Sequence, residues 1–422
     1  MADRTGVDRR NYAANLVEGG LYLGATPFFS PQTVLPALVA GLGGGNLAVG
    51  AVAVLNYAAV FGPQAFVARH VAALRWKKPW ALGFGAAQRS MVLLLGLAVL
   101  AFGGAHRGLT LALVLSLFAA NQLVLGAAAL GWFDLFAKLT PVALRGGLVG
   151  WRNALGGCIS VVGGGVLTWL LAAFAFPRGF ALALLAAFGL QLASLLVQLR
   201  YVETEPSPVM PRTSLGAFVR ELHAVFRRER GFMLFVCYAA GSYLAMMPVG
   251  FFTVYALERF HAGAAAVGTF TLMLVTVQIV SAPLCGALAD RFGNKVALAV
   301  ATSALLAASA WALIATTLAA FAPVFVLVGI NLGTEYMARH NMAAEYAPEE
   351  QRAVFVGMMN TTLAPFCLSG LVGGVISNAF GHRAVFAVGI GLAALALAVL
   401  LLLVRDPRHA GQRRPPGDPA SP

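Results

Sequence analysis

Long apolar runs dominate this chain, and short polar or glycine- and proline-rich stretches separate them. Most runs exceed twenty residues and lack the strict alternation of apolar and polar positions that barrel strands show. A helix crosses roughly 30 Å of hydrocarbon with about 20 apolar residues and satisfies its own backbone hydrogen bonds there. We therefore predict an all-α integral membrane protein with twelve membrane-spanning helices, at residues 14–40, 46–69, 79–103, 108–131, 147–175, 179–199, 231–257, 263–289, 295–317, 320–338, 353–379 and 384–404.

The composition agrees with this prediction. Hydrophobic residues make up 59% of the 422 positions and charged residues only 11%, and the mean hydropathy is +0.81. Soluble domains carry roughly 25% charged residues, so that class is excluded. The first fifteen residues are polar and the first apolar run is too long for a cleavable signal. We expect the first helix to act as an uncleaved insertion signal.

The net charge of +13 is unevenly distributed along the chain. With the N-terminus placed in the cytoplasm, 23 of the 29 Lys and Arg residues fall on the cytoplasmic side, four on the opposite side and two within spans. This positive-inside asymmetry predicts a protein of the bacterial inner membrane with both termini in the cytoplasm. It also explains the basic charge without a nucleic-acid partner.

Residues suited to an active centre are scattered. The four cysteines stand singly inside apolar spans, with neither metal-ligand spacing nor a disulfide framework. The seven histidines are spread over loops and tails, and no nucleotide-binding G-x-x-x-x-G-K-[ST] loop occurs. We therefore expect no metal, no cofactor and no enzymatic activity, and a membrane-embedded enzyme is a minor alternative.

A polar stretch divides the twelve spans into six plus six. It begins as a proline-rich linker and ends in a predicted amphipathic helix near residues 215–226, lying along the membrane surface. The predicted organisation is an N-terminal six-helix bundle at 1–199, a cytoplasmic linker at 200–230, a C-terminal six-helix bundle at 231–404 and a disordered cytoplasmic tail at 405–422.

The two halves share a weak internal similarity. Displacing the second half by 207 residues aligns residues 125–153 with 332–360, and eight positions are identical. The identities include a proline before the span, an arginine at its mouth (Arg145 and Arg352), and a glycine and an asparagine inside it. Two repeated halves joined by a loop are the plan of a transporter that rocks its halves about a midplane binding site.

The run GALADRFGNK at residues 286–295 resembles the G-x-x-x-D-R-x-G-x-K/R motif of the major facilitator superfamily. The Pro-x3-Arg-x4-Gly pattern that opens spans five and eleven is also similar to that superfamily. The resemblance implies two pseudo-symmetric six-helix bundles and secondary transport by alternating access.

Several residues of this motif have a mechanical use. We expect Gly286 to allow close approach of a neighbouring helix and Gly293 to permit a tight turn. Arg291 and Lys295 then lie on the basic side of the membrane, where Lys295 starts the next span.

The acid of the motif is the predicted gate residue. In the superfamily its partner is typically the start of span eleven, which implies an Asp290–Arg352 latch that closes the cytoplasmic gate. The alternative is a loop carboxylate satisfied by water. The first half has Arg and His at 69–70 where the acid would fall, so we expect the equivalent latch to Arg145 to be missing or provided by another acid such as Asp134.

Ionisable residues at membrane depth are costly and are candidate sites. Glu18 lies near the start of the first span, where snorkelling or gate pairing competes with ligand contact. Arg89 either faces a water-filled path or reaches the interface. Arg152 and Asn153 could hold an anionic or hydroxylated solute, or pack against Gln122 and its neighbour Asn121 in span four.

Glu335 and Arg339 stand four residues apart in span ten, which is the spacing of an intrahelical ion pair. A purely structural pair is one interpretation. In the other, Glu335 lies beside Asn331 as a proton or substrate site whose charge is neutralised in one state.

These features favour a secondary active transporter of a small organic solute, coupled to protons. The arginines favour uptake of an organic anion, whereas the aromatic first span and the apolar lining favour efflux of a lipophilic compound, and the choice stays open. A transport-inactive membrane sensor or scaffold of the same fold is the alternative. The expected partners are a solute, a coupling ion and the lipid bilayer.

Overall fold

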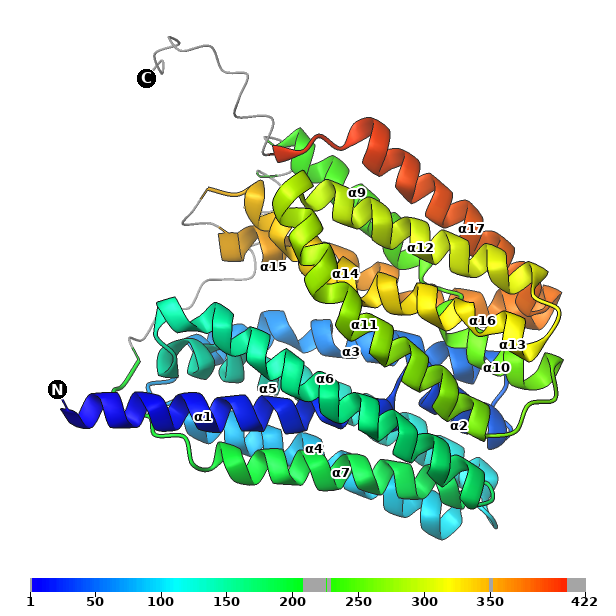
Figure 1. Ribbon diagram of the computed structural model, residues 1–422, viewed down its shortest axis with the longest axis horizontal. Helices are drawn as coiled ribbons and strands as arrows, with labels where there is room; N and C mark the ends of the chain where they lie inside the picture. Colours follow the sequence, from blue (N-terminus) through cyan, green and yellow to red (C-terminus); the bar gives the residue numbers. More distant parts are fainter. Residues whose placement is uncertain (1, 208–224, 226–228, 349–351, 408–422) are drawn as a thin grey trace.

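The computed structural model describes residues 2–207, 225, 229–348 and 352–407, which are almost entirely helical (Figure 1). The predicted amphipathic helix and most of the predicted tail lie outside this part. No strand occurs among the described residues, in agreement with an all-α protein. With η marking short 3-10 or π segments, the order is α1 (Ala2–Gly24), η1 (Thr26–Phe29), α2 (Val34–Gly41), α3 (Asn46–Ala72), α4 (Lys78–Phe102), α5 (Arg107–Leu139), α6 (Val142–Ala173), α7 (Arg178–Gln198), α9 (Arg230–Ala245), α10 (Val249–Arg259), α11 (Ala265–Phe292), α12 (Asn294–Ile314), α13 (Leu318–Phe321), α14 (Pro323–Glu345), α15 (Arg352–Leu363), η3 (Ala364–Leu368), α16 (Ser369–Phe380), α17 (His382–Ala398) and η4 (Val399–Leu403).

Ten helical segments of the described chain are long and apolar enough to cross a membrane. The other two predicted spans correspond to α1 with α2 and to α3, whose apolar part runs from Asn46 to Tyr57. The multi-pass membrane architecture is confirmed, and the count of twelve stays a prediction.

The predicted first span is broken rather than continuous. Proline lacks a backbone N–H and ends or kinks helices, and Pro27 opens the 3-10 turn η1 that separates α1 from α2. The break frees the carbonyl of Gln32, which accepts a hydrogen bond from Thr253 of α10 at 3.4 Å. The break thus brings a polar residue of the first half against the second half.

The helices form two bundles, one before residue 199 and one after residue 230. In Figure 1 the first bundle lies below the second. In the first, α1 packs on α6 and α7, and α4 packs on α5 and α7. In the second, α14 packs on α11 and α12, and α17 packs on α12 and α9. The start of α1 and the end of η4 lie at the same end of the molecule, at the left in Figure 1. We name it the terminal end, and its counterpart the opposite end.

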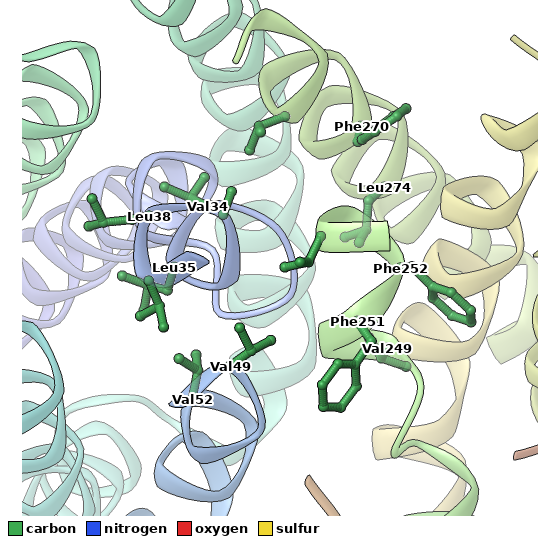
Figure 2. Packing of buried hydrophobic residues seen from close by; sticks show 14 of the residues in the cluster. Val34, Leu35, Leu38, Val49, Val52, Val249, Phe251, Phe252, Phe270 and Leu274 are labelled. Carbon is green, nitrogen blue, oxygen red and sulfur yellow. The ribbon is translucent and has the colours of Figure 1, made fainter. Parts of the chain in front are cut away.

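An apolar cluster joins the two bundles near the opposite end. Figure 2 shows side chains of α2 and α3 converging with side chains of α10 and α11. Val34, Leu35, Val49, Phe251 and Leu274 belong to this cluster, and each is no more than 2% exposed. Lipid is as apolar as these side chains, so the interface gains from close packing rather than from leaving water.

Two polar or backbone contacts reinforce this junction. The hydroxyls of Thr33 and Thr271 lie 2.6 Å apart across the halves. A Cβ built on Gly50 of α3 would lie 2.1 Å from the carbonyl oxygen of Gly370 in α16, so only glycine allows this backbone approach. These contacts hold the halves together at the opposite end.

Glu203 anchors the start of the linker to the first bundle. Its carboxylate accepts hydrogen bonds from the backbone N–H groups of Lys77 and Lys78, both at 2.9 Å, and from the Lys138 ammonium at 2.7 Å. Burial acts to raise the pKa of this carboxyl, but the three donors outweigh it, and the pKa lies below its ordinary value. The folded protein therefore favours ionised Glu203.

We expect Glu203→Gln to lower the free energy of unfolding by about 2 kcal/mol at neutral pH, because it weakens charge-assisted hydrogen bonds. The folded-state pKa of Glu203 lies below the unfolded value, so its contribution is complete above the unfolded pKa and is lost as pH falls through the folded pKa. Thermal unfolding in detergent at pH 7 and pH 3 should show the gap between wild type and variant closing at acid pH. An unchanged gap at pH 3 would contradict this role, and Asp8→Asn in α1 is the matched control.

Candidate functional site

A small cavity lies between the two bundles. It is lined by Gln32 after η1, Asn56 and Tyr57 of α3, Tyr243 of α9 and Ser369 at the start of α16. Its volume is about 30 Å³, which accommodates little more than a water molecule. Amide and hydroxyl groups on its wall can both donate and accept hydrogen bonds. Residues of both halves thus line the cavity, and the repeated sequence predicts a binding site between the halves.

The candidate residue Gln122 is connected to this cavity through Asn56. Its Nε2 donates to Asn56 Oδ1 at 2.9 Å, and Asn56 lines the cavity. The neighbouring Asn121 instead donates to the carbonyl of Gln88 at 2.8 Å and ties α5 to α4. A buried amide that reaches a cavity residue can hold it in position for a ligand.

Glu335 and Arg339 form an ion pair behind the cavity wall. Arg339 Nη1 lies 2.8 Å from Glu335 Oε1, and the side chains are only 2% and 7% exposed. Arg339 Nη2 donates to the Tyr243 hydroxyl at 2.9 Å, and the guanidinium lies 4.5 Å from the centre of that ring. Tyr243 in turn meets Tyr57 of the other half edge to face, with ring centres 5.8 Å apart. The pair is therefore linked to the cavity through Tyr243.

Asn331 does not hydrogen-bond to Glu335 among the described contacts. Its amide nitrogen donates to the carbonyl of Ala301 at 2.9 Å, which ties α14 to α12. Among the described contacts, Arg339 Nε is a buried donor with no acceptor. An unsatisfied buried donor costs about 1–3 kcal/mol, so this nitrogen would gain from a ligand or water that reached it.

The charged residues of the first half form a separate buried cluster. Arg152 Nη2 lies 3.2 Å from Glu18 Oε2, and Arg89 Nη2 lies 3.8 Å from Glu18 Oε1. Ser194 and Tyr201 donate further hydrogen bonds to the Glu18 carboxylate, at 3.3 Å and 3.2 Å. One carboxylate thus faces two guanidinium groups, and the cluster keeps a net positive charge.

This cluster corrects three expectations. Glu18 is 3% exposed and does not snorkel to the surface. Arg89 neither faces a water path nor reaches the interface, because it is 5% exposed and donates to the Gln191 carbonyl and Ser194 hydroxyl of α7. Arg152 does not pack on Gln122: it donates to Asn15 and lies over the Trp132 ring at 4.5 Å.

A glycine of α1 makes room for Arg152. A Cβ built on Gly19 would lie 1.9 Å from Arg152 Nε, so any larger residue would displace the guanidinium from Glu18. Asn153, the next residue on α6, is exposed and lies outside the cluster. The structure therefore separates two candidates that are adjacent in the sequence.

Sequence reasoning missed the polar cavity residues. They are Gln32, Asn56, Tyr57, Tyr243 and Ser369, which carry no charge and so do not stand out by the cost of placing a charge in a membrane. A signal was available, because amide and hydroxyl side chains interrupt otherwise apolar runs at these positions.

The comparison with known proteins decides the family. The family model described as Major Facilitator Superfamily matches residues 19–364 and 234–422. The chain is a member of the major facilitator superfamily. No curated protein matches it by sequence.

Solved structures of transporters share this fold at low identity. The nucleoside transporter NupG, in a mutant form, is 13% identical with a TM-score of 0.72, covering 93% of this chain and 100% of its own. The D-xylose-proton symporter is 13% identical with a TM-score of 0.69, covering 95% and 99%. A bacterial homologue of the human lysosomal transporter Spinster, inward-facing and unoccupied, is 14% identical with a TM-score of 0.66, covering 98% and 99%.

The superfamily motif forms the turn between α11 and α12 at the terminal end. Gly293 has a φ of +93°, a conformation that favours glycine, which confirms the predicted tight turn. Lys295 donates to the carbonyl of Leu401 at 3.0 Å, and Arg291 lies over the Phe292 ring at 5.1 Å. The expectation for Gly286 was wrong, because a Cβ built there would meet open space.

The gate residues occupy the ends of their helices. Asp290 is exposed near the end of α11, and Arg352 is exposed at the start of α15. Their pairing stays a prediction. In the first half, Arg145 caps the end of α5 by donating to the carbonyls of Thr140 and Ala137. Asp134 binds Lys77 at 3.3 Å, so its suggested role as the partner of Arg145 is not supported.

We expect Glu18→Gln to destabilise the protein by about 3–5 kcal/mol, because it leaves two buried guanidinium groups without a carboxylate. The double variant Glu18→Gln with Arg152→Gln should recover part of this loss, since the residues form one network. Denaturant unfolding in detergent measures both. The network would be refuted if the double variant lost more unfolding free energy than the two single variants lose together. Glu258→Gln, which replaces an exposed acid, is the control.

The predicted latch can be tested by charge exchange. Asp290→Arg and Arg352→Asp should each reduce transport at least tenfold in proteoliposomes, and the double variant should recover part of it because the opposite charges face each other again. Asp290→Arg combined with Arg405→Asp restores the same net charge elsewhere and should recover nothing. Equal recovery in both combinations would show that net charge, and not this pair, is responsible.

Proposed function

We propose that this protein is a secondary active transporter that moves a small organic anion by alternating access and couples it to protons at Glu335. The observation that carries the proposal is the buried Glu335–Arg339 pair, joined through Tyr243 to the cavity between the halves. We further propose that the terminal end faces the cytoplasm of a bacterial cell, from the positive-inside asymmetry.

The contacts between the halves support an alternating mechanism. The apolar cluster, the Thr33–Thr271 bond and the Gly50–Gly370 approach all lie toward the opposite end. The central cavity is too small for an organic solute. Solute entry therefore requires the bundles to move apart, and the terminal end is the side on which this motion would open the cavity.

The ion pair supports coupling between a proton and an anion. Ionised Glu335 neutralises Arg339, so a bound anion would gain little from that guanidinium. Protonation of Glu335 removes the carboxylate charge and leaves Arg339 and its free Nε donor for an anionic group. Binding of a proton and of an anion would then favour each other, as coupled transport requires.

The cavity offers hydrogen bonds to a polar solute. Gln32, Asn56, Ser369 and the two tyrosines provide hydrogen-bonding groups, beside an apolar part of the wall that includes Met246 and Val249. Arg89 and Arg152 no longer count as support for an anion, because Glu18 neutralises part of their charge away from the cavity. Arg339 is instead the residue that provides the positive charge for the anion.

The test is a screen of organic anions and neutral solutes in proteoliposomes, with and without an imposed pH gradient. Wild-type uptake of the matching anion should rise at least tenfold with the gradient. Glu335→Gln should still exchange the solute but lose the response to the gradient, because it mimics the protonated state permanently. Arg339→Gln should weaken binding at least tenfold, which corresponds to about 1.4 kcal/mol.

Controls separate coupling from folding. Glu258→Gln removes an exposed carboxylate at the opposite end and should leave the gradient response intact. A gradient response that survives in Glu335→Gln would refute the proton role. Uptake confined to lipophilic compounds would favour efflux of such compounds, and a folded protein that transports nothing in the screen would favour a sensor or scaffold.

A further inference from the structure

A cleft separate from the central cavity lies at the terminal end of the first bundle. It has a volume of about 430 Å³ and lies between the start of α4, the early part of α1 and the segment that follows α7. Arg10, Lys78 and Arg200 line it, together with Trp76 and Glu203. It is far larger than the central cavity and open at its mouth, so a ligand can reach it without movement of the bundles.

The cleft is built by a rigid segment, residues 199–203. Lys78 Nζ donates to the carbonyls of Leu199 at 3.0 Å and Tyr201 at 2.7 Å. Asn11 clamps Val202 from the other side, with one hydrogen bond to its carbonyl at 3.0 Å and one from its N–H at 2.9 Å. These hydrogen bonds fix the backbone of the segment beside the cationic side chains. A backbone that is already ordered reduces the entropy lost when a ligand binds.

The cleft keeps an excess of positive charge. Glu203 is its acid, and that carboxylate is already bound by Lys138 and by two backbone N–H groups. Lys77 pairs with Asp134. The described ion pairs leave Arg10, Lys78 and Arg200 without a carboxylate, so three cations face one neutralised acid across the cleft.

The position of the cleft matches the level of lipid headgroups. It lies where α4 begins and α7 ends, at the boundary of two predicted spans. Trp76 is 45% exposed and Leu199 is 51% exposed beside it. Tryptophan is enriched at the membrane interface because its ring is apolar and its N–H is polar. An exposed leucine at this level can contact an acyl chain.

We propose that this cleft binds the phosphate of an anionic lipid headgroup. Basic pockets at the cytoplasmic ends of membrane helices attract such headgroups, and the excess of cations provides the charge. Arg10 and Arg200 present planar guanidinium groups, which bind phosphate oxygens through paired N–H donors. Lys78 adds a point charge that the carbonyls of Leu199 and Tyr201 hold in place. A soluble phosphate would satisfy the same donors, whereas only a lipid would also use Trp76 and Leu199.

The experiment uses the intact protein purified in detergent, with native mass spectrometry to count bound lipid. Dioleoylphosphatidylglycerol is compared with dioleoylphosphatidylcholine, and wild type should bind the anionic lipid at least tenfold more tightly. Each Lys or Arg near such a surface contributes a factor of about five. Arg10→Gln with Arg200→Gln should therefore weaken phosphatidylglycerol binding about thirtyfold. Both side chains are exposed, so the fold should survive their replacement.

A matched control removes the same charge from the same end of the other bundle. Arg230→Gln with Arg405→Gln replaces two exposed arginines outside the cleft and should leave binding within twofold of wild type. Sodium phosphate is then added as competitor: retention of the lipid identifies the headgroup as the ligand, and displacement that depends on Arg10 and Arg200 identifies soluble phosphate. The proposal is wrong if the cleft variant binds phosphatidylglycerol as wild type does, or if both double variants lose it equally.

Discussion

A charged side chain in the middle of a bilayer costs at least about 2.5–3.5 kcal/mol, and the rest of this structure is arranged around that cost. The five ionisable residues predicted at membrane depth are gathered into two clusters, Glu18 with Arg89 and Arg152, and Glu335 with Arg339. Hydroxyl groups complete both clusters: Ser194 and Tyr201 bind Glu18, and Tyr243 binds Arg339. In the first bundle, charge pairing therefore also joins α1 to α4 and α6.

The two clusters differ in what they can do. The Glu18 cluster is enclosed within the first bundle, and its residues bind α1 to α4, α6 and α7. The Glu335–Arg339 pair lies on one helix and touches the cavity through Tyr243. An ion pair that holds several helices together resists a change of charge, whereas the proposed proton coupling at Glu335 would change the charge of a pair that lies within one helix. The proposed division is thus between a structural half and a coupling half.

Sequence reasoning predicted the all-α membrane fold, the superfamily and the tight turn at Gly293, because each depends on local pattern or on a short motif. It also predicted the Glu335–Arg339 pair, since residues four apart on a helix are neighbours in any fold. It failed for Arg89 and Arg152, whose partner Glu18 is remote in the chain. It also failed for Gly286, because close approach depends on where a neighbouring helix lies in this conformation.

The sequence by itself determined the length and apolarity of the spans, the polar breaks between them and the spacing of residues on each helix. These follow from the thickness of the bilayer and from helix geometry. Only the tertiary structure decided which charges meet, which polar residues line the cavity and that Arg10, Lys78 and Arg200 share one cleft. Such contacts join residues that are far apart along the chain, and lipid-facing and helix-facing sides of an apolar helix are nearly alike in sequence.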